Sequence, residues 1–120
     1  MKMELVKINE RTKTDEENGV TYIGTEYSIG DYQVERIEKH YKDGEMVENI
    51  HVSASWEDRN EKFLPEIYFN DDWFGTKKKH FDIQTSSYGA LAPEEIEKVI
   101  AGYQQAVEVV ETLTDKFIGE

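Results

Sequence analysis

The chain has 120 residues, with 26 acidic against 14 basic side chains and a formal net charge of −12. Its apolar content of 38% and aromatic content of 12% are typical of a folded protein, because an acidic disordered chain contains few aromatic residues. Cysteine is absent, which excludes disulfides and thiolate metal sites. No apolar run approaches the roughly 18 residues of a membrane span, and no secretion signal is visible, so we expect a cytoplasmic protein that does not bind membranes.

Neither a repeat nor a low-complexity tract divides the chain, so we predict a single domain over residues 1–120. Residues 1–92 contain the predicted strands of an antiparallel sheet, and residues 93–118 contain one helix. A domain of this length can bury one hydrophobic core.

The first strands are separated by turn signals. Residues 3–8 form a short apolar run, and the polar stretch after it, through Asn18-Gly19, is typical of a long turn. Residues 20–29 are rich in β-branched and aromatic side chains, and Gly30-Asp31 fits a two-residue hairpin loop.

Residues 32–42 are ambiguous, because some of their apolar residues also have helical spacing. We interpret them as a strand, since a two-residue turn at Asp43-Gly44 would pair Tyr41 with Met46. That register would collect apolar residues on one face, namely Ile37, Tyr41, Met46, Ile50, Val52 and Ala54.

A second hairpin is predicted with arms at 67–69 and 80–85. The clearest element follows it, because apolar residues recur with helical spacing from Pro93 to Phe117. This predicted core stripe comprises residues 96, 99, 100, 103, 106, 107, 110, 113 and 117. Pro93 suits the first helical position, and Gly119 is placed to end the helix. We therefore predict an α+β fold: an antiparallel, mostly meander sheet of five or six strands, with one long amphipathic helix packed on one face.

Catalytic and metal sites are not indicated. In the predicted register His40 and His51 share a face but lie about 13 Å apart, too far for one zinc ion. Ser86 and Ser87 have no base arranged to activate them, and residues 75–79 lack the glycine spacing of a phosphate-binding loop. We expect no enzyme, no cofactor and no metal.

Two surfaces are candidates for partner binding. The first is the loop 70–79, where Trp73 and Phe74 follow Asp71 and Asp72 and precede three lysines. Tryptophan is enriched at binding hot spots, so this loop could anchor a partner. The alternative is that both aromatic residues fold back over the sheet edge while the lysines protect it from aggregation.

The second surface is the predicted outward face of the helix, where five carboxylates lie along about 32 Å. They belong to Glu94, Glu97, Glu108, Glu111 and Asp115. Such a row can imitate a nucleic-acid backbone and occupy a basic groove of another protein. The alternative is an ordinary solvated face. The negative charge argues against direct binding of DNA or RNA.

The stretch from Phe81 to Ile96, FDIQTSSYGALAPEEI, continues into Tyr103 and the helical residues 107–113. This segment resembles small uncharacterised proteins of phages, prophages and conjugative elements of low-GC Gram-positive bacteria. The resemblance covers about the last forty residues and contains no catalytic motif, so it implies no functional residues. It implies a mobile-element protein in the cytoplasm of a bacterial host, and small acidic phage proteins often inhibit host enzymes or defence systems.

These observations favour a non-enzymatic, acidic interaction protein that binds and inhibits a basic or nucleic-acid-handling host protein, of the anti-defence or DNA-mimic type. One alternative is a binder of small, nucleotide-like ligands, with Lys77–Lys79 holding a phosphate. Its pocket would be lined by Tyr68, Trp73, Phe81 and Tyr88. Another is a virion or assembly component that forms a homo-oligomer.

Overall fold

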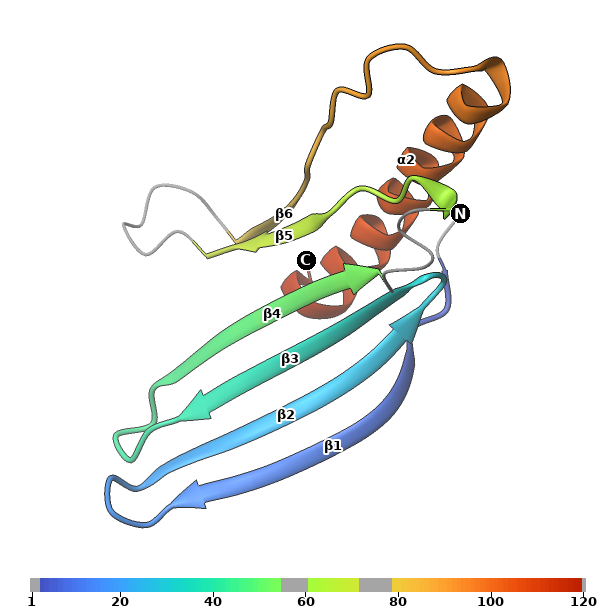
Figure 1. Cartoon of the computed structure of the whole chain (residues 1–120). Coiled ribbons are helices and arrows are strands. Elements are labelled where there is room, and N and C mark those ends of the chain that lie inside the picture. The colour runs from blue at the N-terminus through green and yellow to red at the C-terminus, as the bar shows by residue number, and fades with distance from the viewer. Residues whose placement is uncertain (1–2, 55–60, 72–78, 120) are drawn as a thin grey trace.

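The computed structural model describes residues 3–54, 61–71 and 79–119, and these form an antiparallel sheet with a helix against one face (Figure 1). Within these ranges the sheet has six strands in the order of the chain, which confirms the predicted α+β meander with one C-terminal helix. The elements are β1 (Val6–Asp15), β2 (Val20–Ile29), β3 (Tyr32–His40), β4 (Met46–Ala54), β5 (Ile67–Asn70), β6 (His80–Ile83) and α2 (Pro93–Leu113), which continues as a π-helical turn over Thr114–Ile118.

Strand β1 corrects the prediction of a long turn after residue 8. The polar residues that follow Ile8 continue the strand to Asp15, and only the four residues from Glu16 to Gly19 connect it to β2. Nearly every residue of β1 is exposed, since it is an edge strand held by backbone pairing with β2. Charged side chains suit such an edge, because they discourage pairing with other chains.

The β2–β3 hairpin is confirmed, with Ile29 paired to Tyr32 across the two-residue loop Gly30-Asp31. The β3–β4 register, in contrast, is wrong by one residue. His40, not Tyr41, pairs with Met46, because the loop contains three residues, Lys42-Asp43-Gly44, with Gly44 at a φ of 90°. A one-residue slip moves every side chain of one strand to the other face.

This slip exchanges the predicted faces of β3. Tyr32 and Val34 join the core, and Ile37 points to the opposite face. His40 and His51, predicted to share a face, lie on opposite faces, because His51 is in register with Glu35 and His40 with Met46.

The core lies between the sheet and the C-terminal half of α2. Tyr32 is fully buried and donates its hydroxyl hydrogen to the Pro65 carbonyl at 2.6 Å. The buried core residues are Ile29, Tyr32, Val34, Ile50, Val52, Leu64, Ile67, Phe81, Ala106, Val109 and Leu113. Three of them are small or medium residues of α2, so the helix approaches the sheet closely.

The chain between β4 and β5 contacts the middle of α2 and so helps to fix the position of the helix. A Cβ atom at Gly102 would lie 2.6 Å from the Phe63 carbonyl oxygen and 3.0 Å from that of Lys62. Only glycine therefore allows this close approach, although glycine weakens a helix interior by about 1 kcal/mol relative to alanine.

A polar cluster connects the β2–β3 loop to α2. Asp31 accepts a hydrogen bond from Lys62 at 2.9 Å and one from the Gln105 side-chain amide at 2.9 Å, and its own backbone N–H donates to Gln105 Oε1 at 2.9 Å. These bonds, that of Lys62 foremost, lower the pKa of the Asp31 carboxyl from its ordinary value.

A second cluster lies on the same face, near the C-terminal end of α2. Glu48 is buried, and its carboxylate accepts a hydrogen bond from Arg36 Nε at 2.7 Å and forms an ion pair with Arg36 Nη2, also at 2.7 Å. Lys79 lies 3.5 Å from the same carboxylate, and the Arg36 guanidinium stacks 5.3 Å from the centre of the Phe117 ring. Arg36 therefore compensates a buried charge and also packs against the last helical turn.

Replacement of Arg36 by alanine is expected to lower the free energy of unfolding by about 2–4 kcal/mol, because Glu48 stays buried with a weaker counterion. Urea denaturation measures the loss. Arg11→Ala is the matched control: Arg11 lies 3.8 Å from Glu26 with a side chain that is 71% exposed, so its loss should change stability by less than about 0.5 kcal/mol. Equal losses in the two variants would contradict the compensating role of Arg36.

Asp31→Asn is expected to reduce stability at neutral pH and to flatten its acid dependence. Because the pKa of Asp31 is lowered in the folded state, its contribution is present above the ordinary aspartate pKa of about 4 and is lost as pH falls through the lowered value. Urea denaturation from pH 7 to about pH 2.5 tests this. The exposed control Asp43→Asn should have the pH profile of the wild type. If the profile of Asp31→Asn is no more altered than that of this control, the role of Asp31 is contradicted.

Candidate protein-binding surface

Helix α2 buries less of its apolar surface than its sequence predicts. The buried residues of α2 are Gly102, which lies against the chain at Lys62 and Phe63, and Ala106, Val109 and Leu113, which belong to the core under the sheet. Ile96, Ile100 and Val107, which were predicted to lie in the core, are exposed, and Tyr103 between them is half-buried. We call these four residues, Ile96, Ile100, Tyr103 and Val107, the apolar strip.

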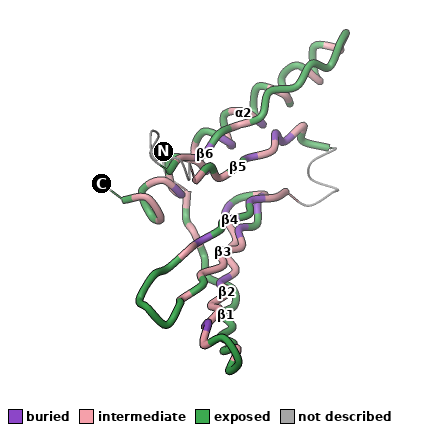
Figure 2. The backbone as a smooth tube through the Cα atoms, turned by 90° about the vertical axis from the view of Figure 1, so that its left-hand side faces the viewer, coloured by how far each residue is buried: buried purple, intermediate pink, exposed green. Residues whose placement is uncertain are grey.

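The strip is uncovered because the helix is rotated relative to the predicted core stripe and because part of the helix extends beyond the sheet. Its centre lies about 120° around the helix axis from the residues that face the sheet. The half of α2 that follows Pro93 also projects beyond the sheet (Figure 1), and the tube there is mostly exposed in Figure 2. A flat sheet covers only one side of a helix, so the remaining apolar side faces solvent.

Carboxylates border one side of this strip. Glu97 and Glu111 are exposed and Glu108 is half-buried, and we call these three residues the carboxylate border. A shallow hollow on the helix surface joins the two sets, since its lining includes Ile100, Tyr103 and Val107 together with Glu108 and Glu111. The strip and the border therefore form one continuous surface.

The other predicted partner-binding residues fall in different places. Glu94 lies in the first turn of α2 and is exposed. Asp115, also exposed, lies in the π-helical turn, where it lines a hollow with Met3 and Lys7 near β1. Asp71 is half-buried directly after β5, while Asp72, Trp73 and Phe74 lie outside the residues that the structure describes.

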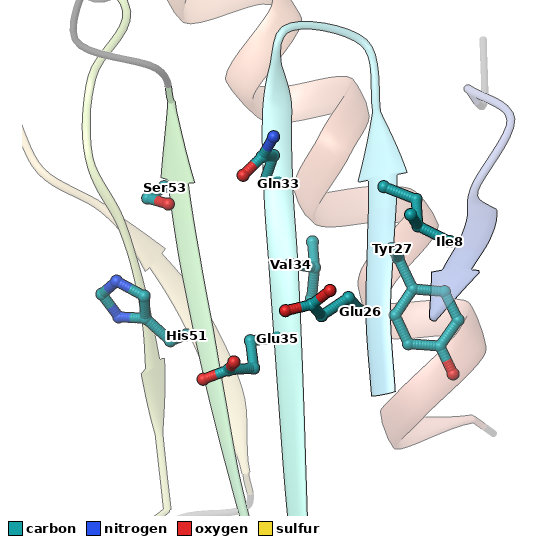
Figure 3. A pocket seen from close by; sticks show the side chains of 8 residues that line it. All are labelled: Ile8, Glu26, Tyr27, Gln33, Val34, Glu35, His51 and Ser53. Carbon is teal, nitrogen blue, oxygen red and sulfur yellow. The ribbon is translucent and has the colours of Figure 1, made fainter. Parts of the chain in front are cut away.

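A third hollow, of about 310 Å³, lies over the middle of the sheet (Figure 3). Glu26, Glu35 and His51 occupy neighbouring positions in one cross-strand row and point away from α2. The opposition of Glu26 and Glu35 places like charges side by side, and Arg11 lies 3.8 Å from Glu26. Across 3–54, 61–71 and 79–119, no group of three or more His, Asp or Glu residues could hold a metal ion.

The aromatic residues of the small-ligand alternative do not meet in one pocket. Phe81 is in the core, whereas Tyr68 is exposed on the opposite face in register with His51. Tyr88 packs edge-on against Phe63 with ring centres 5.4 Å apart. The fourth residue, Trp73, is outside the described ranges.

No protein-family model matches the chain, and neither the search of curated proteins nor that of solved structures returned a match. In the part of the chain that the structure describes, no helix has the length and apolar character needed to cross a membrane.

Sequence reasoning assigned the apolar strip to the core and so missed it as a surface. The signal that could have revealed it is the width of the apolar face. Val109 and Gly102 are also buried, so the apolar positions of α2 cover about half of the helix circumference. One sheet cannot bury so wide a face.

Two substitutions by alanine in α2 test which side of the helix is exposed to solvent. Leu113→Ala should lower the free energy of unfolding by about 2–4 kcal/mol, because Leu113 is 0% exposed. Ile100→Ala should lower it by less than about 1 kcal/mol, because Ile100 is 52% exposed. Urea denaturation of both variants measures the difference, and a loss for Ile100→Ala as large as that for Leu113→Ala would place the strip in the core.

Proposed function

We propose that this protein is a non-enzymatic, acidic interaction protein that binds and inhibits a basic or nucleic-acid-handling protein of a bacterial host. The observation that carries the proposal is the surface of α2, where an uncovered apolar strip lies directly beside a row of carboxylates. An apolar strip exposed to water is typical of a protein-binding site, and its acidic border suits a basic partner.

The distribution of the charges supports this proposal. The buried Glu48 is compensated by Arg36 and Lys79, so its charge is used within the fold. Glu94, Glu97 and Glu111, in contrast, project from the helix into solvent. With a net charge of −12, the molecule attracts cations over long distances, and a row of carboxylates can compete with a phosphate backbone for a basic groove.

A phage or mobile-element origin, which we propose from the resemblance of the last forty residues, would suit the inhibitory role. Inhibition would follow if the carboxylates occupy the groove in which the partner holds nucleic acid. Binding to this chain and binding to DNA or RNA would then exclude each other.

Affinity capture in matched columns tests the proposal. Wild-type protein on a column should retain a basic protein from a Gram-positive lysate at about 50 mM salt and release it by about 500 mM, because salt screens the charges. A column of Glu94→Gln/Glu97→Gln/Glu111→Gln should retain at least about tenfold less. The control column, Glu16→Gln/Glu17→Gln/Glu45→Gln, removes as many exposed charges from the distant hairpin loops and should behave like wild type.

The captured protein then tests inhibition. Its binding to DNA or RNA should fall as this chain is added, with the triple helix variant less effective than the hairpin control. Retention that is unchanged up to about 500 mM salt would contradict the electrostatic basis of the proposal. A retained protein that binds nucleic acid equally well in the presence of this chain would contradict the inhibitory role.

A further inference from the structure

We propose that the apolar strip of α2 docks an amphipathic helix of the basic partner, which covers Ile100, Tyr103 and Val107 with apolar side chains and pairs Lys or Arg with the carboxylate border. The inference rests on the proposed function, because it names the segment through which the basic partner binds.

The shape of the strip favours a helical occupant. Its residues follow one another at i, i+4, i+7 and i+11, which makes a nearly straight ridge about 16 Å long. Such a ridge fits the groove between side-chain rows of another helix over about three turns. The backbone of α2 pairs with itself and offers no hydrogen bonds along this side. A segment that covers the ridge must therefore satisfy its own backbone groups, as a helix does and an extended strand does not.

The carboxylates beside the strip indicate which charged side chains the partner helix carries and where they lie. Glu97, Glu108 and Glu111 lie on one side of the strip only. The opposite side carries the half-buried Val99 and the Tyr103 hydroxyl, which accepts a hydrogen bond from the Ser86 backbone N–H at 3.0 Å. A partner helix therefore meets carboxylates along one edge and apolar residues elsewhere. We expect its Lys and Arg side chains along the edge that faces these carboxylates.

A second copy of this chain fits the same surface poorly. Two copies packed antiparallel about a two-fold axis would place their carboxylate borders on the same side of the contact, where Glu97 and Glu108 would repel each other. The net charge of −12 on each copy adds to this repulsion. We therefore assign the strip to a partner of opposite charge.

Three synthetic peptides of about 18 residues serve as probes. The first contains only Leu and Lys, with Leu spaced to form one stripe of a helix and Lys beside it. The second is a scramble of the same composition with no helical stripe, and the third replaces every Lys by Glu. Titration calorimetry measures their affinity for the full chain, and amide chemical shifts identify the residues that they contact.

We expect the striped Lys peptide to bind at about 50 mM salt at least about tenfold more tightly than the scramble, and the Glu peptide not to bind. The shifts should centre on Ile100, Tyr103 and Val107. Ile100→Ser/Val107→Ser should weaken the binding of the striped peptide by about tenfold or more. The matched control Val6→Ser/Ile8→Ser removes equally exposed apolar residues from β1 and should leave it unchanged.

The outcomes separate the inference from the proposed function. If the scramble binds as tightly as the striped peptide in a salt-dependent way, the acidic protein-binding function stands and the helical occupant is wrong. Shifts confined to residues outside α2 also overturn the inference alone. If neither Lys peptide binds at low salt, the proposed function fails together with it. A stable dimer in sedimentation that Ile100→Ser/Val107→Ser dissociates would assign the strip to a second copy instead.

Discussion

The close contact between the middle of α2 and the chain before β5 determines how the rest of the helix is placed. Gly102 lies against the carbonyls of Lys62 and Phe63, and Ala106 and Leu113 continue the contact onto the sheet. Because these residues set the rotation of the helix, they also determine which apolar side chains stay in solvent. Ile100 and Val107 are exposed as a direct result of this rotation.

The charges of the protein fall into two groups with different roles. Arg36, Glu48 and Lys79 form a compact cluster beside Phe117, where each ion has a partner and the acid is buried. The carboxylates of α2 lie outside, beside an apolar strip. An acidic surface of this kind is not a source of stability, since like charges three or four residues apart on a helix repel each other. In the proposed complex this charge would favour a positively charged partner and would speed the encounter with it.

The accuracy of the sequence prediction followed the strength of the local signals. Gly30-Asp31 is compatible with only one loop length, a two-residue loop, and the β2–β3 hairpin was therefore predicted correctly. Strand β1 was missed because its residues are polar on both faces, and an edge strand can be held by backbone bonds alone. The β3–β4 register was wrong because Asp43-Gly44 is compatible with a two-residue or a three-residue loop, and the loop length decides which face Val34 occupies.

The sequence by itself determined the α+β architecture, the helix that follows Pro93 and the acidic character of its exposed side, because these depend on local periodicity and composition. Only the tertiary structure decided which part of the wide apolar face of α2 is buried. Periodicity shows that a helix has an apolar face, but the width of the sheet and the close approach at Gly102 set how much of that face is covered. The candidate binding surface, Ile96 to Val107 beside Glu97 and Glu111, is the part that remained uncovered.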